Sequence, residues 1–321
     1  MKNFWENKNV LVTGCCGTVG SKLLEELVKF KAKKIVGIDN NESGIFEKRL
    51  KFKNKDILVG DVVDLADCMQ YTKNIDIVFH TAAFKHVELC ELSPRNAVRN
   101  NIQGTQNLIS ACIKNNVKKF IFTSSDKSVN PTNVMGSTKL LCERLVSSAN
   151  NLSNETIFSS VRFGNILGSR GSVLTIFKKQ IDESKPLTIT DLDMTRYVMS
   201  LQKACNLLLK SAILSQGGEV FVLKMSAIKI FDLAKSFYKL KNGNLQNFKY
   251  KIVGKKNAEK KYEELITNEE KKKLINKKDI LIINLDKKDN KKVCFIETNS
   301  HNDKHLSIDQ IVKILRDVEV N

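Results

Sequence analysis

The chain has 321 residues, of which 42% are hydrophobic, and its 53 Lys and Arg against 35 Asp and Glu give a formal net charge of +18. The apolar fraction excludes intrinsic disorder, three Pro and 15 Gly exclude a collagen-like chain, and the lack of an unbroken apolar run of about 18 residues excludes a membrane span. The length predicts two domains or one large α/β unit.

The positive charge allows two interpretations. A concentrated basic patch would indicate a nucleic acid or an anionic membrane as partner. The excess is mostly Lys, however, and it is scattered along the chain. The stretch richest in Lys, 255–292, also holds several glutamates, as is typical of a solvated face. We therefore expect a lysine-rich surface and no nucleic-acid partner.

The eight cysteines and the N-terminus bear on location. No Cys-x-x-Cys and no Cys/His cluster occurs in the sequence, so we expect neither a metal site nor a redox dithiol. Near the N-terminus, Glu6, Lys8 and Asn9 interrupt the apolar residues, and a signal peptide would need an apolar core there. We expect a cytoplasmic protein without a membrane anchor.

The first half of the chain alternates short apolar runs with helical patterns. The runs are strand-like and continuously apolar, as parallel strands buried on both faces must be. A helix is predicted at 21–30, with Leu23, Leu24 and Leu27 on one face, and another at 94–115. The alternation predicts a doubly wound parallel α/β sheet of the Rossmann type. Its predicted strands are 9–13, 34–39, 56–60, 76–80 and 118–123.

The pattern loosens after Arg162. A helix is predicted at 201–214 and a strand at 219–223, followed by a polar C-terminal third. We therefore expect a smaller substrate-binding domain that closes over the carboxyl ends of the strands, where ligands of such sheets bind. The predicted division assigns 1–165 and a returning 194–224 to the dinucleotide-binding domain, and 166–193 and 225–321 to the substrate-binding domain.

A glycine-rich loop follows the first predicted strand. Gly14, Gly17 and Gly20 are spaced three residues apart, with Thr18 and Val19 between the last two, and a helix follows. This spacing permits a tight turn, a close approach of the backbone to a pyrophosphate, and packing of the helix on the sheet. All five residues are predicted to bind a dinucleotide.

Asp39 ends the second predicted strand, about twenty residues after the loop. Its carboxylate can accept hydrogen bonds from both ribose hydroxyls but would repel a 2′-phosphate, so NAD is expected rather than NADP. Asn40 is expected beside the same ribose. The alternative is that Asp39 only caps a turn with Asn40 and Asn41.

Several motifs resemble the extended short-chain dehydrogenase/reductases, and longer segments resemble their polysaccharide-biosynthesis branch, the nucleotide-sugar 4,6-dehydratases. The resemblance extends from about Lys8 to Leu265, and the family's best-known activity is dehydration of UDP-N-acetylglucosamine. The matching segments are Gly60-Asp61-Val62, Thr81-Ala82-Ala83-Phe84-Lys85-His86-Val87, Asn101-Ile102-Gln103-Gly104-Thr105, residues 125–139, Arg162-Phe163-Gly164-Asn165 and Gly168-Ser169-Arg170-Gly171-Ser172.

Met135 departs from the Tyr-x-x-x-Lys motif that most of these enzymes carry. Lys139 keeps the lysine, but a thioether at 135 cannot exchange a proton. One interpretation is a dead enzyme. The other is that acid–base catalysis has moved, because Met at this position is similar to the branch that retains configuration at C5, whose members are often larger and membrane-anchored.

Elimination of water across C5 and C6 of a hexose requires prior oxidation at C4, because a C4 ketone acidifies the C5–H bond. An acid and a base must then stand near the nicotinamide, at the end of the fifth strand. The resemblance implies that Asp126 protonates the C6 oxygen and that Lys127 removes the C5 proton. Lys127 would then be partly neutral, aided by burial and Lys139, and Asp126 protonated. Asp126, aided by Ser125, is expected to take the C4 hydroxyl proton.

The same resemblance implies further binding residues. Lys139 would bind the nicotinamide ribose. The segment 254–265 keeps Glu259 of the family's element but has Lys-Asn-Ala in place of Arg-Pro-Gly. Further cofactor contacts are expected from Asp61, Val62, Ala82, Ala83, Lys85 and Asn101. Substrate contacts are expected from Lys85, His86, Asn165, Arg170, Thr190, Arg196 and Glu259.

Three interpretations of function remain open. The first is a UDP-N-acetylglucosamine 4,6-dehydratase in glycan biosynthesis. The second, a 4-epimerase, normally depends on the missing Tyr and makes no use of Asp126 and Lys127. The third is a non-catalytic dinucleotide sensor or scaffold. An Asp-Lys pair in a surface turn would fit the third, and the family resemblance favours the first, as a homo-oligomer.

Overall fold

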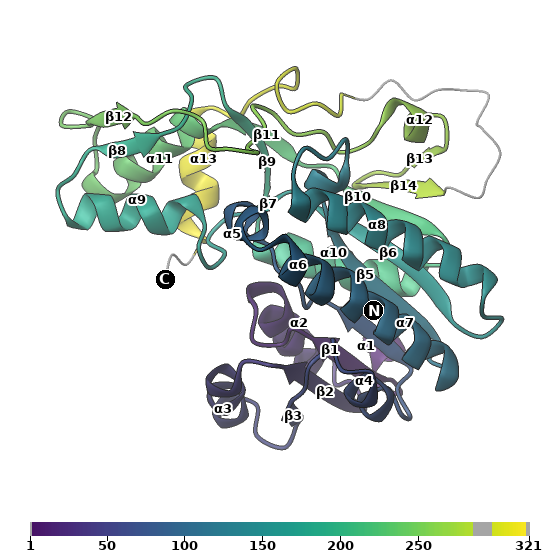
Figure 1. Cartoon of the computed structure of the whole chain (residues 1–321). Coiled ribbons are helices and arrows are strands. Elements are labelled where there is room, and N and C mark those ends of the chain that lie inside the picture. Colours follow the sequence, from purple (N-terminus) through teal and green to yellow (C-terminus); the bar gives the residue numbers. More distant parts are fainter. Residues whose placement is uncertain (1, 285–296, 319–321) are drawn as a thin grey trace.

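The computed structural model describes residues 2–284 and 297–318. Its centre is a nine-stranded sheet in the order β13-β14-β10-β6-β5-β4-β1-β2-β3 (Figure 1). The seven strands from β3 to β10 are parallel. β14 runs antiparallel to β10, and β13 at the edge runs antiparallel to β14. The strands are β1 (Asn9–Thr13), β2 (Lys34–Asp39), β3 (Asp56–Val59), β4 (Ile77–His80), β5 (Lys119–Ser125), β6 (Ile157–Phe163), β10 (Glu219–Leu223), β13 (Leu274–Asn276) and β14 (Ile280–Asn284). This confirms the predicted α/β parallel sheet.

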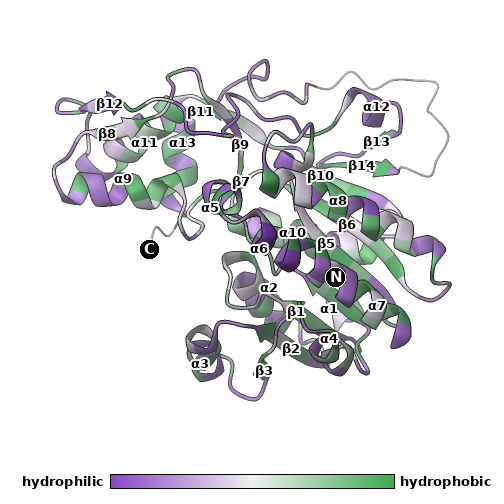
Figure 2. Cartoon of the chain, viewed as in Figure 1, coloured by the Kyte–Doolittle hydropathy of each residue, from purple (hydrophilic) through white to green (hydrophobic). Residues whose placement is uncertain are grey.

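Helices cover both faces of the sheet because its strands are apolar on both sides. Val10 and Val12 point into one core and Leu11 into the other. Figure 2 shows hydrophobic residues along these strands. The first core is covered mainly by α1 (Lys2–Trp5), α2 (Thr18–Lys29), α3 (Glu42–Lys51) and α10 (Leu201–Leu214), and the second by α4 (Leu65–Tyr71), α7 (Gly104–Lys114) and α8 (Val134–Ser148).

The helix predicted at 94–115 is interrupted. It begins as α6 (Pro94–Ala97), which follows α5 (Val87–Leu92), widens into a π-helical turn, Val98–Gln103, and continues as α7. The wide turn holds Asn101 inward, where its side chain accepts from the Phe84 amide at 2.8 Å and donates to the Phe84 carbonyl at 3.1 Å. Such turns are common at functional sites. Short 3₁₀ turns follow β5 (Asp126–Ser128) and α8 (Ala149–Asn151).

A second, smaller part lies beside the carboxyl ends of the strands (Figure 1). Its core joins three helices to short strands. These elements are β7 (Asn165–Ile166), α9 (Val173–Asp182), β8 (Leu187–Ile189), β9 (Thr195–Met199), β11 (Ser226–Lys229), α11 (Ile230–Asn242), β12 (Tyr250–Ile252) and α13 (Ile308–Arg316).

The path of the chain between the two parts differs from the predicted division. Within 194–224, α10 and β10 return to the large sheet, but β9 joins the three-stranded sheet β11-β9-β7. Within 225–321, assigned wholly to the second part, α12 (Asn268–Lys271), β13 and β14 return to the large sheet and its edge. Their hydrophobic residues complete the core around β10, so the large sheet holds two strands that the polar composition of this region concealed.

Candidate active site

The cofactor loop, Thr13–Gly20, leaves the sheet at the carboxyl end of β1 and enters α2. Gly14 has φ +67°, and a Cβ there would lie 2.6 Å from the Ala82 backbone. A Cβ at Gly20 would overlap the Gly14 carbonyl, and one at Gly17 would lie 3.2 Å from it. Glycine is therefore required at 14 and 20, and the contact at 17 would be tight, so the loop backbone carries no side chain at these points.

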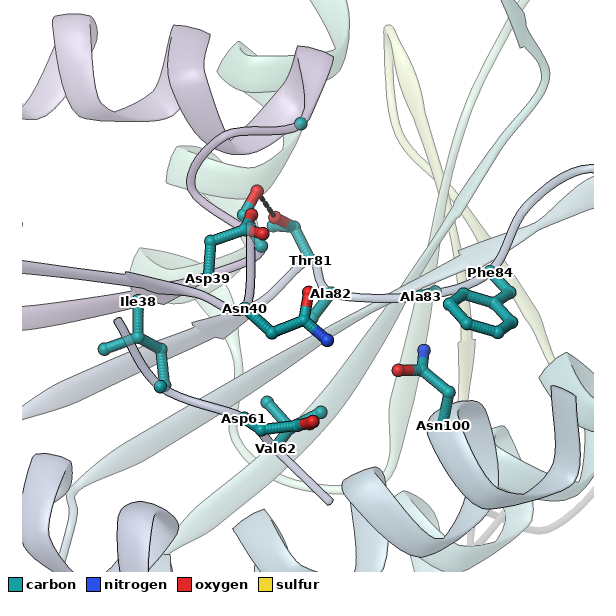
Figure 3. Close-up of a pocket in the computed structure, with 13 residues that line it drawn as sticks. Ile38, Asp39, Asn40, Asp61, Val62, Thr81, Ala82, Ala83, Phe84 and Asn100 are labelled. Carbon is teal, nitrogen blue, oxygen red and sulfur yellow. Dashed lines mark hydrogen bonds between the residues drawn. The ribbon is translucent and has the colours of Figure 1, made fainter. Parts of the chain in front are cut away.

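A cavity of about 150 Å³ lies against this loop. Figure 3 shows Asp39 and Asn40 on one side of it and Phe84 and Asn100 on the other. The sequence did not single out several lining residues, because they contribute through backbone or position rather than through a motif. The lining comprises Gly14, Gly17, Ile38, Asp39, Asn40, Gly60, Asp61, Val62, Thr81, Ala82, Ala83, Phe84 and Asn100.

Asp39 fits both of its interpretations. It lines the cavity, as a ribose-binding carboxylate would. Its Oδ1 also accepts from the Asn41 amide and its Oδ2 from the Cys16 amide, each at 3.0 Å, so it orders the turn and ties it to the cofactor loop. Asn41 in turn caps α3.

Six residues expected to bind the cofactor do not line this cavity, and their role stays a prediction. Asn101 is buried, and its side chain bonds to Phe84 and Thr138, while its neighbour Asn100 lines the cavity. The other five are Thr18, Val19, Gly20, Lys85 and Lys139. Lys85 instead donates to the Arg170 carbonyl at 2.8 Å.

Arg170, expected at the substrate, lies on the cofactor loop. Its guanidinium donates to the Cys16 carbonyl at 3.3 Å, and its amide donates to the Thr18 hydroxyl at 3.2 Å. Gly171 follows with φ +69°, and a Cβ there would lie 2.6 Å from the His86 ring. The segment around Arg170 thus crosses from the second part to the cofactor loop.

The catalytic residues expected after β5 lie together. Asp126 is fully buried, and its Oδ1 accepts from the Ser125 hydroxyl at 2.9 Å and from Lys127 Nζ at 3.0 Å. Lys127 also donates to Asn165 Oδ1 at 3.3 Å. Asp126 Oδ2 has no hydrogen-bond partner among the described residues. A buried, unpaired carboxylate oxygen is costly and is a position for a donor from a ligand.

Glu263 completes this group and was not among the predicted site residues. Its Oε1 lies 3.4 Å from Lys127 Nζ and 3.8 Å from Arg196 Nε, and its side chain is 2% exposed. We name Asp126, Lys127, Arg196 and Glu263 the acid–base cluster. The only sequence signal was that Glu263 falls in the segment matching the family's Glu-Glu-Leu element.

The protonation of the two lysines differs from expectation. Burial would lower the pKa of Lys127, but the attraction of Asp126 and Glu263 outweighs it and raises that pKa. Burial lowers the pKa of Lys139 to about 8. The Lys139 ammonium donates to the Thr123 carbonyl at 2.8 Å. Lys139, rather than Lys127, is therefore the lysine that loses its proton more readily before substrate arrives.

Met135 packs into an apolar cluster. It is 3% exposed and contacts Cys90, Ala97 and their neighbours on α5 and α6. Although it occupies the position of the family's tyrosine, it contributes only an apolar surface.

The remaining predicted substrate residues are divided. Arg196 is buried and donates to the carbonyls of Thr195 and Lys260, and its guanidinium lies 3.4 Å from Glu259. Thr190 instead donates to Met194 Sδ at 3.4 Å. The structure therefore unites Asn165, Arg196 and Glu259 but not Thr190.

Cys15, Cys16 and Asp39 form a grouping the sequence did not predict, with ligand atoms within 4.8 Å of one another. Both Asp39 oxygens already accept backbone amides. Burial raises the pKa of Cys16 to about 11 and that of Cys15 further, so both thiols stay protonated. The grouping is typical of thiols packed behind a turn.

The parallel sheet and the glycine-rich cofactor loop are those of an extended short-chain dehydrogenase/reductase. A family model described as "Polysaccharide biosynthesis protein" matches residues 10–285. The chain belongs to this polysaccharide-biosynthesis family. Among residues 2–284 and 297–318, no helix has the length and apolar character needed to cross a membrane.

Known proteins similar to this chain include both characterised and uncharacterised relatives. The uncharacterized membrane protein MJ1061 of Methanocaldococcus jannaschii is 42% identical over 99% of this chain and 98% of that protein. A UDP-N-acetylglucosamine 4,6-dehydratase (inverting) of Campylobacter jejuni is 37% identical over 83% and 79%. A UDP-glucose 4-epimerase of Rickettsia rickettsii is 33% identical over 96% and 95%. The X-ray structure of Pen from Bacillus thuringiensis is 40% identical, has a TM-score of 0.91 and covers 98% of both chains.

Proposed function

We propose that this chain is a nucleotide-sugar 4,6-dehydratase that acts on UDP-N-acetylglucosamine with NAD. The observation that carries the proposal is the buried Asp126-Lys127 pair with its unpaired Asp126 oxygen. The sheet register pairs Thr13 with His80 and His80 with Phe122. Because these strands are parallel, the segments that follow them all leave at the carboxyl ends of the strands. The Asp126-Lys127 pair after β5 therefore lies at the same end of the sheet as the cofactor loop after β1.

The cofactor fits the residues present. The glycines leave the loop backbone open, and Asp39 lines the cavity where a ribose would bind. When bound, a nicotinamide cofactor would supply the hydride chemistry, by which C4 of the sugar is oxidised and C6 is later reduced. The Asp39 carboxylate favours NAD over NADP because it would repel a 2′-phosphate. Lys139 holds the nicotinamide ribose from α8.

The acid–base cluster supplies the proton transfers. Asp126, with Ser125 donating to it, takes the C4 hydroxyl proton and later gives a proton to the departing C6 oxygen. Lys127 as a free amine removes the C5 proton. The bond from C6 to oxygen breaks, water leaves, and a proton returns to C5 from Lys127. Retention at C5 is part of the proposal because Met135 resembles the retaining branch, although the Campylobacter relative is named as inverting.

Substrate binding falls to residues around the acid–base cluster. Asn165 contacts Lys127, and the Arg196 guanidinium can turn from Glu259 toward a diphosphate. His86 lies against Gly171, beside the Arg170 segment. The side chain of Thr190 forms no part of this proposal.

Product mass tests the proposal. The protein is incubated with UDP-N-acetylglucosamine and NAD, and the nucleotide sugar is analysed by mass spectrometry. Loss of one water is the expected result. An unchanged mass with a new isomer would instead support a 4-epimerase, and no product at all would support a dinucleotide sensor.

The epimerase is the second candidate because the Rickettsia relative aligns over nearly the whole chain. Epimerisation needs oxidation at C4 but no acid for the C6 oxygen and no base for C5. The buried Asp126-Lys127 pair would then have no acid or base role at C6 and C5. For this reason the dehydratase is preferred.

A further inference from the structure

Glu263 is a carboxylate that the proposed reaction has not yet used. It lies between β12 and α12, and its backbone is fixed to Ser300: the Glu263 amide donates to Ser300 Oγ and the Ser300 amide to the Glu263 carbonyl, both at 2.9 Å. The Ser300 hydroxyl also bonds to Thr195 Oγ1 at 2.9 Å. These bonds hold the side chain in the interior, where a carboxylate is costly unless it is paired.

The two carboxylates of the acid–base cluster, Asp126 and Glu263, are placed in the same way around Lys127. Each has one oxygen close to Lys127 Nζ, at 3.0 Å for Asp126 Oδ1 and 3.4 Å for Glu263 Oε1. The other oxygen of each, Asp126 Oδ2 and Glu263 Oε2, is buried without a hydrogen-bond partner among the described residues. Asp126 transfers protons in the proposed reaction, and the similar placement of Glu263 indicates that Glu263 also transfers a proton.

Lys127 must lose a proton before it can act as the base for C5. An ammonium cannot remove a proton from carbon, and this ammonium is stabilised by the two carboxylates. It must therefore give up a proton before elimination. Burial raises the pKa of the Glu263 carboxyl, although Lys127, Arg196 and Lys260 oppose that effect. A carboxylate whose pKa is raised, next to a lysine that must be deprotonated, can accept the proton directly.

We infer that Glu263 accepts a proton from the Lys127 ammonium and so generates the amine that removes the C5 proton. One N–H bond breaks at Lys127 and one O–H bond forms at Glu263 Oε1, and the opposite charges of the pair disappear together. The proton returns to Lys127 once C5 has been reprotonated. Glu263 acts through Lys127 as a positioning residue, and this inference rests on the proposed dehydration.

The pH dependence of turnover tests this role. In the wild type the proton moves within the pair, so the number of bound protons is unchanged and kcat should be flat from about pH 6 to 9. In Glu263→Gln the amine forms only by losing its proton to solvent. Its kcat for UDP-N-acetylglucosamine should fall at least about 100-fold at neutral pH and rise about tenfold per pH unit, with KM and NAD affinity unchanged.

The other charged groups around Lys127 and Glu263 are the same in the wild type and in Glu263→Gln. These are Asp126, Arg196, Lys260 and, through Arg196, Glu259. Glu264→Gln is the matched control, because the neighbouring carboxylate accepts from Asn130 at 2.9 Å and lies outside the acid–base cluster. It should keep the kcat and the flat profile of the wild type.

A wild-type kcat in Glu263→Gln, or a lowered kcat with the flat profile of the wild type, would overturn the inference. If Glu263→Gln does not fold, Glu263→Asp is decisive: a reduced kcat with a flat profile supports the transfer, and a sloping profile contradicts it. Failure of the proposed function is separate, because it shows as a wild type that makes no dehydrated product.

Discussion

The cofactor loop and the acid–base cluster are built in opposite ways. The loop is a continuous stretch of eight residues whose function depends on its backbone, and Gly14 and Gly20 are required because a Cβ would meet the backbone of Ala82 or Gly14. The cluster consists of side chains from three separated segments, which meet only when the second part is folded against the sheet. Binding of the cofactor and proton transfer should therefore fail independently when each is disturbed.

The largest expected effect is in the acid–base cluster. Lys127→Ala removes the base while leaving the cofactor loop untouched, so turnover should fall by about two to four orders of magnitude with NAD affinity unchanged. Steady-state kinetics and calorimetric titration with NAD measure the two quantities. A parallel loss of NAD affinity would show that the two regions are not independent.

The next effect concerns the buried network that joins the sheet to the segment after Glu263. Arg162 on β6 is 1% exposed and bonds Glu143 of α8 and Glu270 of α12, each as close as 2.7 Å. Arg162→Ala leaves two buried carboxylates without their partner, so the free energy of unfolding should fall by about 3–5 kcal/mol. Urea denaturation measures this change.

A surface pair provides the control for that prediction. Lys118 and Glu155 lie 2.7 Å apart, with side chains 56% and 60% exposed. Lys118→Ala should cost only about 0–1 kcal/mol. If Arg162→Ala were equally mild, the buried network would not be what fixes α8 and α12 to the sheet.

The smallest effect is at the cofactor side. Asp39→Asn keeps the shape and can still accept the Cys16 amide, but it removes the charge that a ribose hydroxyl would meet. The Kd for NAD should rise about tenfold, which corresponds to a weakened charge-assisted hydrogen bond, and the preference over NADP should shrink, with kcat at saturating NAD unchanged. Fluorescence titration with NAD and with NADP measures both affinities. The control is Asp56→Asn, at an exposed surface pair with Lys34, which should change neither the Kd for NAD nor the preference over NADP.

Local features made the sheet and the cofactor loop predictable. A parallel strand buried on both faces is a continuous apolar run, and the observed β1 and β2 have the predicted bounds. The glycine spacing specifies a backbone shape that does not depend on distant residues. Asp126 and Lys127 were predicted because they directly follow a strand and match a long family motif.

Tertiary contacts were not predictable in the same way. Glu263 is one of several glutamates in a lysine-rich stretch, and only its burial beside Lys127 distinguishes it. Arg170 was expected at the substrate, yet its bond to the Cys16 carbonyl depends on how the second part meets the sheet. β13 and β14 lie in a lysine-rich region, and their place in the large sheet becomes evident only once β14 pairs with β10 and β13 with β14.

The late position of Glu263 in the chain has a consequence for synthesis on the ribosome. The cofactor loop and the neighbouring strands β1, β2 and β4 are available once β5 has been translated, whereas Glu263 and the edge strands β13 and β14 come much later. Contacts between distant residues form slowly, and N-terminal units fold first during translation. A nascent chain can therefore form the cofactor loop and the strands around it before Glu263 has been made, and proton transfer from Lys127 to Glu263 becomes possible only after residue 263 has been translated.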